Sequence, residues 1–217
     1  MKQKIIVLFT ALMLCVGARA ATVQVINGLK YIIYTSQNYA ELTSNDYSQS
    51  KIVIPTSITW NGKKYPVTSL GKSCFSGCSR LTSITISPSV TSLGDECFSG
   101  CSSLTSINIP SSVTSLGDEC FYGCSSLTSV NIPSSVTSLG DYCFANCSRL
   151  TSVNIPSSVT SLDECFYGCS SLTSINIPSS VTSLGDECFY DCSSLTSVNI
   201  PSSVTSLGDE CFYDCSS

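Results

Sequence analysis

Apolar and polar positions follow a unit that recurs about every 23 residues over most of this chain. Within one unit the apolar residues keep fixed places, at Leu104, Ile107, Ile109, Val113, Leu116, Cys120, Phe121 and Cys124. A single coil of this length cannot bury its own apolar flank, whereas stacked coils cover one another. The pattern therefore predicts a solenoid in which each unit forms one coil.

The unit divides into three segments with different patterns. Ser106–Ile109 alternates polar and apolar residues and predicts a short strand, which Pro110 ends because proline cannot donate to a strand ladder. Val113–Leu116 predicts a second short extended segment. In Gly117–Cys124 the glycine permits a corner, and the aspartate that follows can cap one or two helical turns. We therefore expect a right-handed α/β solenoid with a parallel β-sheet on one side and short helical turns on the other.

One unit is shorter than its neighbours. Successive units open with a leucine every 23 residues, but the step from Leu150 to Leu172 is 22 residues. The missing residue is a glycine, because the Ser-Leu-Gly-Asp of other units becomes Ser-Leu-Asp at residues 161–163.

The first twenty residues have the pattern of a secretory signal peptide. Lys2 and Lys4 precede the apolar run Ile5–Val16, and Ala18 and Ala20 are the small residues of a cleavage site. We therefore expect cleavage after Ala20 and a secreted or cell-surface protein. The apolar run is too short to span a bilayer and no other long run follows, so no membrane span is expected in the mature chain.

Residues 21–66 are expected to form a β-rich N-terminal cap. Asn27-Gly28 and Asn61-Gly62 each lie between apolar segments, which is typical of β-hairpin turns. Ile52–Pro55 matches the strand of later units, so this region includes a first, divergent coil with a hairpin inserted at roughly residues 56–66. A divergent cap would cover the apolar end of the stack.

Residues 67–217 are expected to form the leucine-rich-repeat solenoid, with seven Cys-Phe-x-x-Cys units and no C-terminal cap. An uncapped end leaves apolar side chains and strand edges exposed. This predicts either an incomplete sequence or self-association through the open end.

Charge and composition exclude several classes of function. The formal net charge is −5, and from Ser87 onward there are thirteen acidic residues and one basic residue, Arg149. Nucleic acids and anionic membrane surfaces attract basic proteins, so neither is expected as a partner. The chain has no histidine, and it has no nucleophile–base pair, phosphate-binding loop or metal motif, so we expect no enzyme and no cofactor.

The unit resembles that of the BspA-like leucine-rich-repeat surface proteins. Their units read I-P-x-x-V-x-x-I-G-x-x-A-F-x-x-C-x-x-L-x-x-I-x, this chain has IPSSVTSLGDECFYGCSSLTSIN, and the resemblance extends from Lys51 to Ser217. It implies an exported or surface-held protein of host-associated microbes, adhesion to host matrix proteins or to other cells, and no catalytic residues. Two features depart from the family: cysteine replaces the alanine before phenylalanine, and no sorting or anchoring segment is visible.

Apart from Cys15, the cysteines form seven C-x-x-x-C pairs, at Cys74/Cys78, Cys97/Cys101, Cys120/Cys124, Cys143/Cys147, Cys165/Cys169, Cys188/Cys192 and Cys211/Cys215. If this segment is helical, both sulfurs of a pair face inward beside the phenylalanine. Three interpretations stay open: two columns of packed thiols, disulfides permitted by export, or a zinc site.

Acidic residues precede the first cysteine of most units and would stack along one edge, at Asp95, Glu96, Asp118, Glu119, Asp141, Asp163, Glu164, Asp186, Glu187, Asp209 and Glu210. One interpretation is helix capping together with solubility. The other is calcium bound between coils, although calcium takes six or more oxygens and each coil offers only one or two carboxylates.

Two repeating surfaces are candidates for partner contact. The polar side of the predicted strands is either a solvated sheet face or a face that binds an extracellular protein or glycan, and it comprises Thr105, Ser106, Asn108, Thr128, Ser129, Asn131, Thr151, Ser152, Asn154, Thr173, Ser174 and Asn176. The tyrosines that follow phenylalanine are either semi-buried packing or a second contact surface, and they are Tyr122, Tyr167, Tyr190 and Tyr213.

We therefore predict an extracellular binding module whose function is adhesion, with repetition supplying avidity. The alternative is a structural spacer or a self-assembling surface element joined through the open C-terminal coil.

Overall fold

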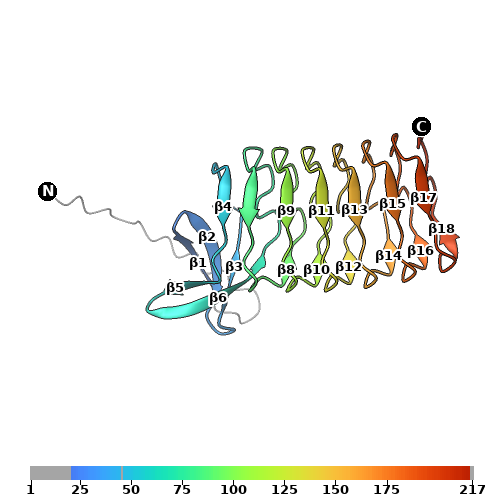
Figure 1. Cartoon of the computed structure of the whole chain (residues 1–217). Coiled ribbons are helices and arrows are strands. Elements are labelled where there is room, and N and C mark those ends of the chain that lie inside the picture. The colour runs from blue at the N-terminus through green and yellow to red at the C-terminus, as the bar shows by residue number, and fades with distance from the viewer. Residues whose placement is uncertain (1–20, 45, 216–217) are drawn as a thin grey trace.

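The computed structural model describes residues 21–44 and 46–215, which form eighteen strands arranged as a solenoid beside a short antiparallel region (Figure 1). The antiparallel region contains β1 (Ala21–Ile26), β2 (Leu29–Tyr34), β3 (Tyr39–Leu42), β5 (Ser57–Trp60) and β6 (Lys63–Leu70), and its β3 and β6 pair with each other in parallel. The first side of the solenoid contains β4 (Lys51–Val53), β7 (Ser83–Thr85), β9 (Ser106–Asn108), β11 (Ser129–Asn131), β13 (Ser152–Asn154), β15 (Ser174–Asn176) and β17 (Ser197–Asn199). The second side contains β8 (Ser92–Leu93), β10 (Ser115–Leu116), β12 (Ser138–Leu139), β14 (Ser161–Leu162), β16 (Ser183–Leu184) and β18 (Ser206–Leu207). The signal peptide predicted at residues 1–20 lies outside the described residues.

The first side is one parallel sheet of seven strands, in the order β17-β15-β13-β11-β9-β7-β4. Equivalent residues of neighbouring coils are partners, so Ser129 lies beside Ser152 and Asn131 beside Asn154. The central residue of a strand such as Val130 is buried and its two neighbours are exposed. The predicted parallel sheet and its alternation of inward and outward side chains are therefore confirmed.

The second side is also parallel, but it is interrupted. Strands β6, β8, β10 and β12 continue the sheet that begins with the antiparallel region, whereas β14, β16 and β18 form a separate sheet. The interruption falls at the 22-residue unit, between Leu139 and Leu162. Leu139 is partly exposed there, whereas Leu116 in the preceding coil is buried.

The helical turns predicted for the third side are wrong, because no helix occurs in the described part of the chain. This side is a run of tight turns with two left-handed residues per coil, such as Glu119 (φ 52°) and Gly123 (φ 64°). The Glu119 amide donates to the Asp141 carbonyl of the next coil (N···O 2.8 Å), and the Gly123 amide donates to the Ala145 carbonyl (2.8 Å). A helix would use these amides within its own turn. Bonds between coils therefore outweigh the local helical preference and offset the unfavourable left-handed geometry at Glu119.

The core consists of columns of identical side chains running the length of the solenoid. Buried phenylalanines stack with ring centroids 5.3 Å apart between Phe98 and Phe121 and 5.2 Å apart between Phe121 and Phe144. The largest centroid distance, 5.8 Å, separates Phe144 from Phe166, the two phenylalanines on either side of the missing residue. The turn side is therefore nearly as closely spaced as a strand ladder, whose strands lie about 4.8 Å apart.

Hydroxyl groups add a further set of bonds between coils. The Ser135 hydroxyl donates to the Val113 carbonyl of the preceding coil (Oγ···O 2.6 Å), and Ser203 repeats this contact with Val181 (2.8 Å). Such bonds need short polar side chains at fixed places rather than charges. They explain why serine and threonine take the polar positions in a chain with 12% charged residues.

Both predicted hairpins are present in the N-terminal region. Asn27 and Gly28, both with positive φ, join β1 to β2, and Asn61 and Gly62 join β5 to β6. The ring of Tyr47 lies 5.1 Å from that of Phe75, which is the first phenylalanine of the stacked column. This contact supports the cap interpretation of residues 21–66, which remains a prediction together with the boundary at residue 67.

Candidate binding surfaces

The polar face of the seven-stranded sheet is the first candidate surface. All twelve residues proposed for it are exposed, and they form straight rows because the coils are in register. The asparagines form one such row, in which the Asn199 amide nitrogen lies 3.4 Å from the Asn176 side-chain oxygen. The structure therefore brings these residues together on one flat, neutral face.

The threonines of this face have a structural role that the sequence pattern did not reveal. The Thr151 hydroxyl donates to the Thr128 carbonyl of the preceding coil (Oγ1···O 3.2 Å), and Thr196 donates to Thr173 in the same way (3.0 Å). These hydroxyl protons are used between coils. The serines and asparagines are therefore the groups of this face that are best placed to reach a partner.

The predicted tyrosine column lies along the turn side and is closely stacked in its C-terminal half. Tyr167 and Tyr190 have ring centroids 4.9 Å apart with an interplanar angle of 7°, and Tyr190 and Tyr213 are 5.1 Å apart. Tyr122 and Tyr213 are exposed, whereas Tyr167 and Tyr190 are half-buried. The rings stack on one another and stay partly exposed, so this arrangement agrees with both interpretations, packing between coils and contact with a partner.

Sequence reasoning missed Tyr142, which belongs to the same surface. Its ring lies 6.2 Å from that of Tyr167 at an angle of 68°. It takes the place of the glutamate found in neighbouring units, because Asp-Glu-Cys becomes Asp-Tyr-Cys in this unit. That substitution was the available signal.

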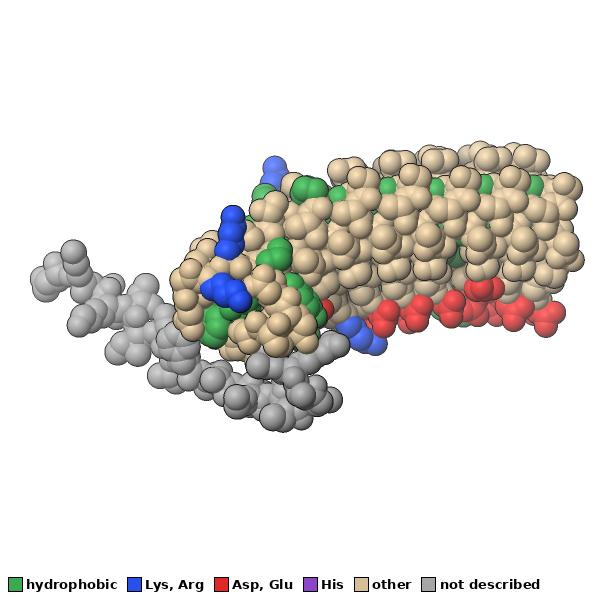
Figure 2. Space-filling model, turned by 90° about the horizontal axis from the view of Figure 1, so that it is seen from below, with side chains coloured by type: hydrophobic (Ala, Val, Ile, Leu, Met, Phe, Trp, Pro, Cys, Tyr) green, Lys and Arg blue, Asp and Glu red, His purple; other side chains and the backbone are tan. Residues whose placement is uncertain are grey.

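The acidic residues line one edge of the solenoid, as Figure 2 shows. The Asp118 carboxylate accepts a hydrogen bond from the Asp141 amide of the next coil (N···Oδ1 3.1 Å), and Asp186 accepts one from Asp209 (2.8 Å). The aspartates therefore cap backbone amides between coils rather than a helix. Within the described residues, no three cysteine, aspartate or glutamate side chains converge in a way that would hold a metal ion.

The fourteen cysteines of the repeats are unbridged in the structure, and all except the half-buried Cys215 are buried. The second thiol of a unit donates to the phenylalanine carbonyl of the preceding coil, as Cys124 does to Phe98 (Sγ···O 3.2 Å). Burial raises the pKa of the Cys124 thiol to about 12. These features agree with the packed-thiol interpretation, since protonated, hydrogen-bonded thiols are poor nucleophiles and poor metal ligands.

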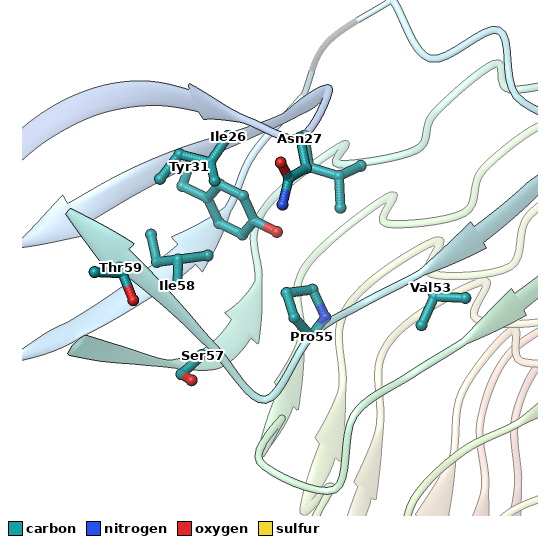
Figure 3. Close-up of a pocket in the computed structure, with 9 residues that line it drawn as sticks. Ile26, Asn27, Tyr31, Val53, Pro55, Ser57, Ile58 and Thr59 are labelled. Carbon is teal, nitrogen blue, oxygen red and sulfur yellow. The ribbon is translucent and has the colours of Figure 1, made fainter.

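Cavities also lie outside the strand face. One, of about 400 Å³, lies between the β1–β2 turn and the start of β5, and Figure 3 shows Tyr31, Asn27 and Pro55 around it. Tyr31 is buried and its hydroxyl has no hydrogen-bond partner among the described residues, while burial raises its pKa to about 12. Another, of about 380 Å³, opens among the tyrosines and glutamates of the turn side.

Comparison with known families matches two segments of this chain, residues 44–165 and 162–217, to the BspA type leucine-rich repeat region, in six copies. The chain belongs to the BspA type leucine-rich repeat family. This confirms the resemblance read from the repeat unit. The family and its fold are generally non-enzymatic, and solenoids of this kind typically present extended binding surfaces.

Solved structures of this kind come from several bacteria. A leucine rich cell surface protein from Faecalibacterium prausnitzii is 33% identical, with a TM-score of 0.80 over 89% of this chain and 52% of its own. A leucine-rich repeat protein from Bacteroides ovatus is 30% identical, with a TM-score of 0.68 over 86% of this chain and 55% of its own. The leucine rich repeat protein of T. pallidum is 28% identical, with a TM-score of 0.79 over 86% of each chain.

This BspA type chain thus spans about half the length of the first two of these proteins. A search among curated proteins gave no match. Within the described residues, no helix has the length and apolar character needed to cross a membrane.

Proposed function

We propose that this BspA type protein is an exported adhesion module that binds host or neighbouring-cell proteins through the polar face of its seven-stranded sheet. The observation that carries the proposal is the register of that sheet, which repeats the same exposed serine and asparagine on adjacent strands. Each repeat offers a weak hydrogen-bonding contact, and several contacts made together supply avidity without a deep pocket. The signal-like pattern at residues 1–20 supports an extracellular location.

Composition supports a polar, many-point interaction. The face lacks arginine, tryptophan and tyrosine, which are the usual anchors of a small, tight interface. The hydroxyls of Thr128 and Thr151 donate to the preceding coil, so partner contact depends chiefly on serine hydroxyls and asparagine amides. We therefore expect modest affinity that rises with the number of coils engaged.

A solid-phase binding assay on extracellular-matrix proteins tests the proposal. The double variant Asn131→Lys, Asn154→Lys places two long charged side chains on adjacent strands of the face and is expected to abolish binding. The matched control, Ser138→Lys with Ser161→Lys, adds the same charge to exposed positions of the second side and should leave binding unchanged.

Thermal unfolding of both variants checks that the solenoid is intact. Binding that persists in the Asn131/Asn154 variant would overturn the assignment of the strand face. A chain that binds no matrix protein, and that shows concentration-dependent growth by light scattering, would replace adhesion with self-assembly.

A further inference from the structure

The cavity on the turn side arises from a local exchange of side chains. In the unit containing Tyr142, a small buried residue, Ala145, occupies the place that tyrosine holds in four other coils. The column of rings is therefore interrupted between Tyr122 and Tyr167. The displaced aromatic group returns three residues earlier as Tyr142, which meets Tyr167 edge-on. The resulting hollow of about 380 Å³ is lined by Glu119, Tyr122, Tyr142, Asn146, Tyr167 and Glu187.

The lining combines the two groups that attract an organic cation. Aromatic faces carry negative potential and bind ammonium or guanidinium groups, and Glu119 and Glu187 supply carboxylates. Among the described residues, the one ion pair joins Lys72 to Glu96, so neither cavity glutamate has a lysine or arginine partner. The surrounding edge is a row of acids (Figure 2). Partial burial and the neighbouring Glu164 carboxylate raise the pKa of Tyr142 to about 12, so its hydroxyl keeps its proton.

We propose that this cavity binds an arginine side chain presented by a basic segment of a partner protein. A planar guanidinium can stack on a tyrosine ring while its fork of donors reaches a carboxylate, which a compact ammonium does less well. Asn146 also lines the cavity, and its side-chain amide carries an oxygen that can accept a hydrogen bond. This site lies on the turn side and goes beyond the proposed function, since it does not use the polar strand face.

The primary experiment titrates the full chain with a short synthetic Gly-Arg-Gly-Arg-Gly peptide and with the same peptide carrying citrulline, followed by calorimetry. Citrulline keeps the shape of arginine and removes the charge, so we expect at least a tenfold loss of affinity. A lysine peptide is expected to bind several-fold more weakly than the arginine peptide. Equal binding of the citrulline peptide would overturn the proposal.

The chain offers matched variants for the cavity. Glu187→Gln and Tyr167→Ala are each expected to weaken the arginine peptide about tenfold. Glu210→Gln and Tyr213→Ala make the same changes in the last coil, outside the cavity, and should leave affinity within about twofold. An equal loss of affinity in the cavity variants and in the control variants would show that the peptide is attracted to the acidic edge in general. That result would contradict the assignment of a specific site.

A second design closes the cavity by restoring the regular side chains around it. The double variant Tyr142→Glu, Ala145→Tyr restores the side chains found in neighbouring units, so we expect it to fold and to lose peptide binding. Retained binding would contradict the proposal, as would choline binding more tightly than the arginine peptide. The Asn131→Lys, Asn154→Lys variant should bind the peptide normally, which separates this site from the strand face.

Discussion

Two coils of this BspA type protein show which parts of the repeat are indispensable. The regular coil Leu104–Ser126 and the short coil Leu150–Ser171 bury the same columns of leucine, isoleucine or valine, cysteine and phenylalanine. They differ in length by one glycine, which the regular coil has at Gly117 and the short coil lacks. The apolar columns pass through both coils, whereas the second sheet stops at the short one.

This glycine is needed because the backbone of the preceding coil lies close to it, and not because of its own backbone conformation. Gly117 does not have positive φ, but a Cβ placed on it would lie 2.5 Å from the Asp95 amide nitrogen and 2.6 Å from the Gly94 carbonyl carbon. Backbone thus packs directly on backbone at this corner. Where the glycine is missing, the apolar core still stacks, but β14 pairs only with β16 and not with β12.

The largest expected effect is a loss of stability at alkaline pH. It should affect both coils, because each contains two buried thiols. Burial raises the pKa of Cys124 to about 12 and that of Cys169 well above its ordinary value near 9. The folded chain therefore holds protons that the unfolded chain releases above pH 9. Stability should be constant below pH 9 and fall as the pH rises from 9 toward 12, by up to about 1.4 kcal/mol per pH unit for each buried thiol.

Urea unfolding in reductant at a series of pH values measures this effect. The Cys124→Ala and Cys169→Ala variants should each reduce the slope above pH 9. Stability that stays flat to pH 11 would contradict the buried-thiol interpretation.

The second-largest loss of stability is expected when a ring is removed from the phenylalanine column. Phe121→Ala is expected to lower the free energy of unfolding by about 3–5 kcal/mol, because it opens a cavity in a tightly packed core. Phe166→Ala should lower it by less, since its neighbours stand 5.8 and 5.6 Å away rather than 5.3 and 5.2 Å. Denaturant titration measures both values, and a larger loss for Phe166→Ala would mean that the short coil is not the looser one.

Two glycines of the regular coil separate crowding from backbone conformation. Gly117→Ala should destabilise the chain by about 2–3 kcal/mol, because its methyl group would meet backbone of the preceding coil. Gly123→Ala meets nothing closer than 3.9 Å and should lose about 1 kcal/mol, from its left-handed φ of 64°. Equal losses, measured by thermal or urea unfolding, would remove the case for close backbone packing at the corner.

The smallest effect has the opposite sign. Inserting a glycine between Leu162 and Asp163 restores a 23-residue unit. We expect β12 and β14 to pair and the free energy of unfolding to rise by about 1–2 kcal/mol, from one or two added hydrogen bonds. Hydrogen exchange should slow at the Ser161 and Leu162 amides. A destabilised variant with unchanged exchange would show that the interruption has another cause.

Much of this molecule follows from the sequence, because a repeat constrains its own packing. The period, the inward row of Ile107 and its equivalents, the buried Phe121 and the hairpin at Asn27-Gly28 were predictable from side-chain alternation and turn chemistry alone. Identical units must stack to bury identical apolar flanks, so the parallel sheet was predictable too. The exposure of Asn131 on the opposite face follows from the same alternation.

Tertiary structure decided what depends on the distance between coils. Asp118–Cys124 has a helix-like sequence, but the amides of Glu119, Phe121 and Gly123 donate to carbonyls of the next coil at 2.8 Å. The segment therefore forms a ladder of turns, with Glu119 in the left-handed region. The cavity beside Tyr142 likewise exists only because residues about 23 positions apart are brought into one row. The local sequence indicates the conformation that each residue prefers, whereas the stacking of coils determines which residues it contacts.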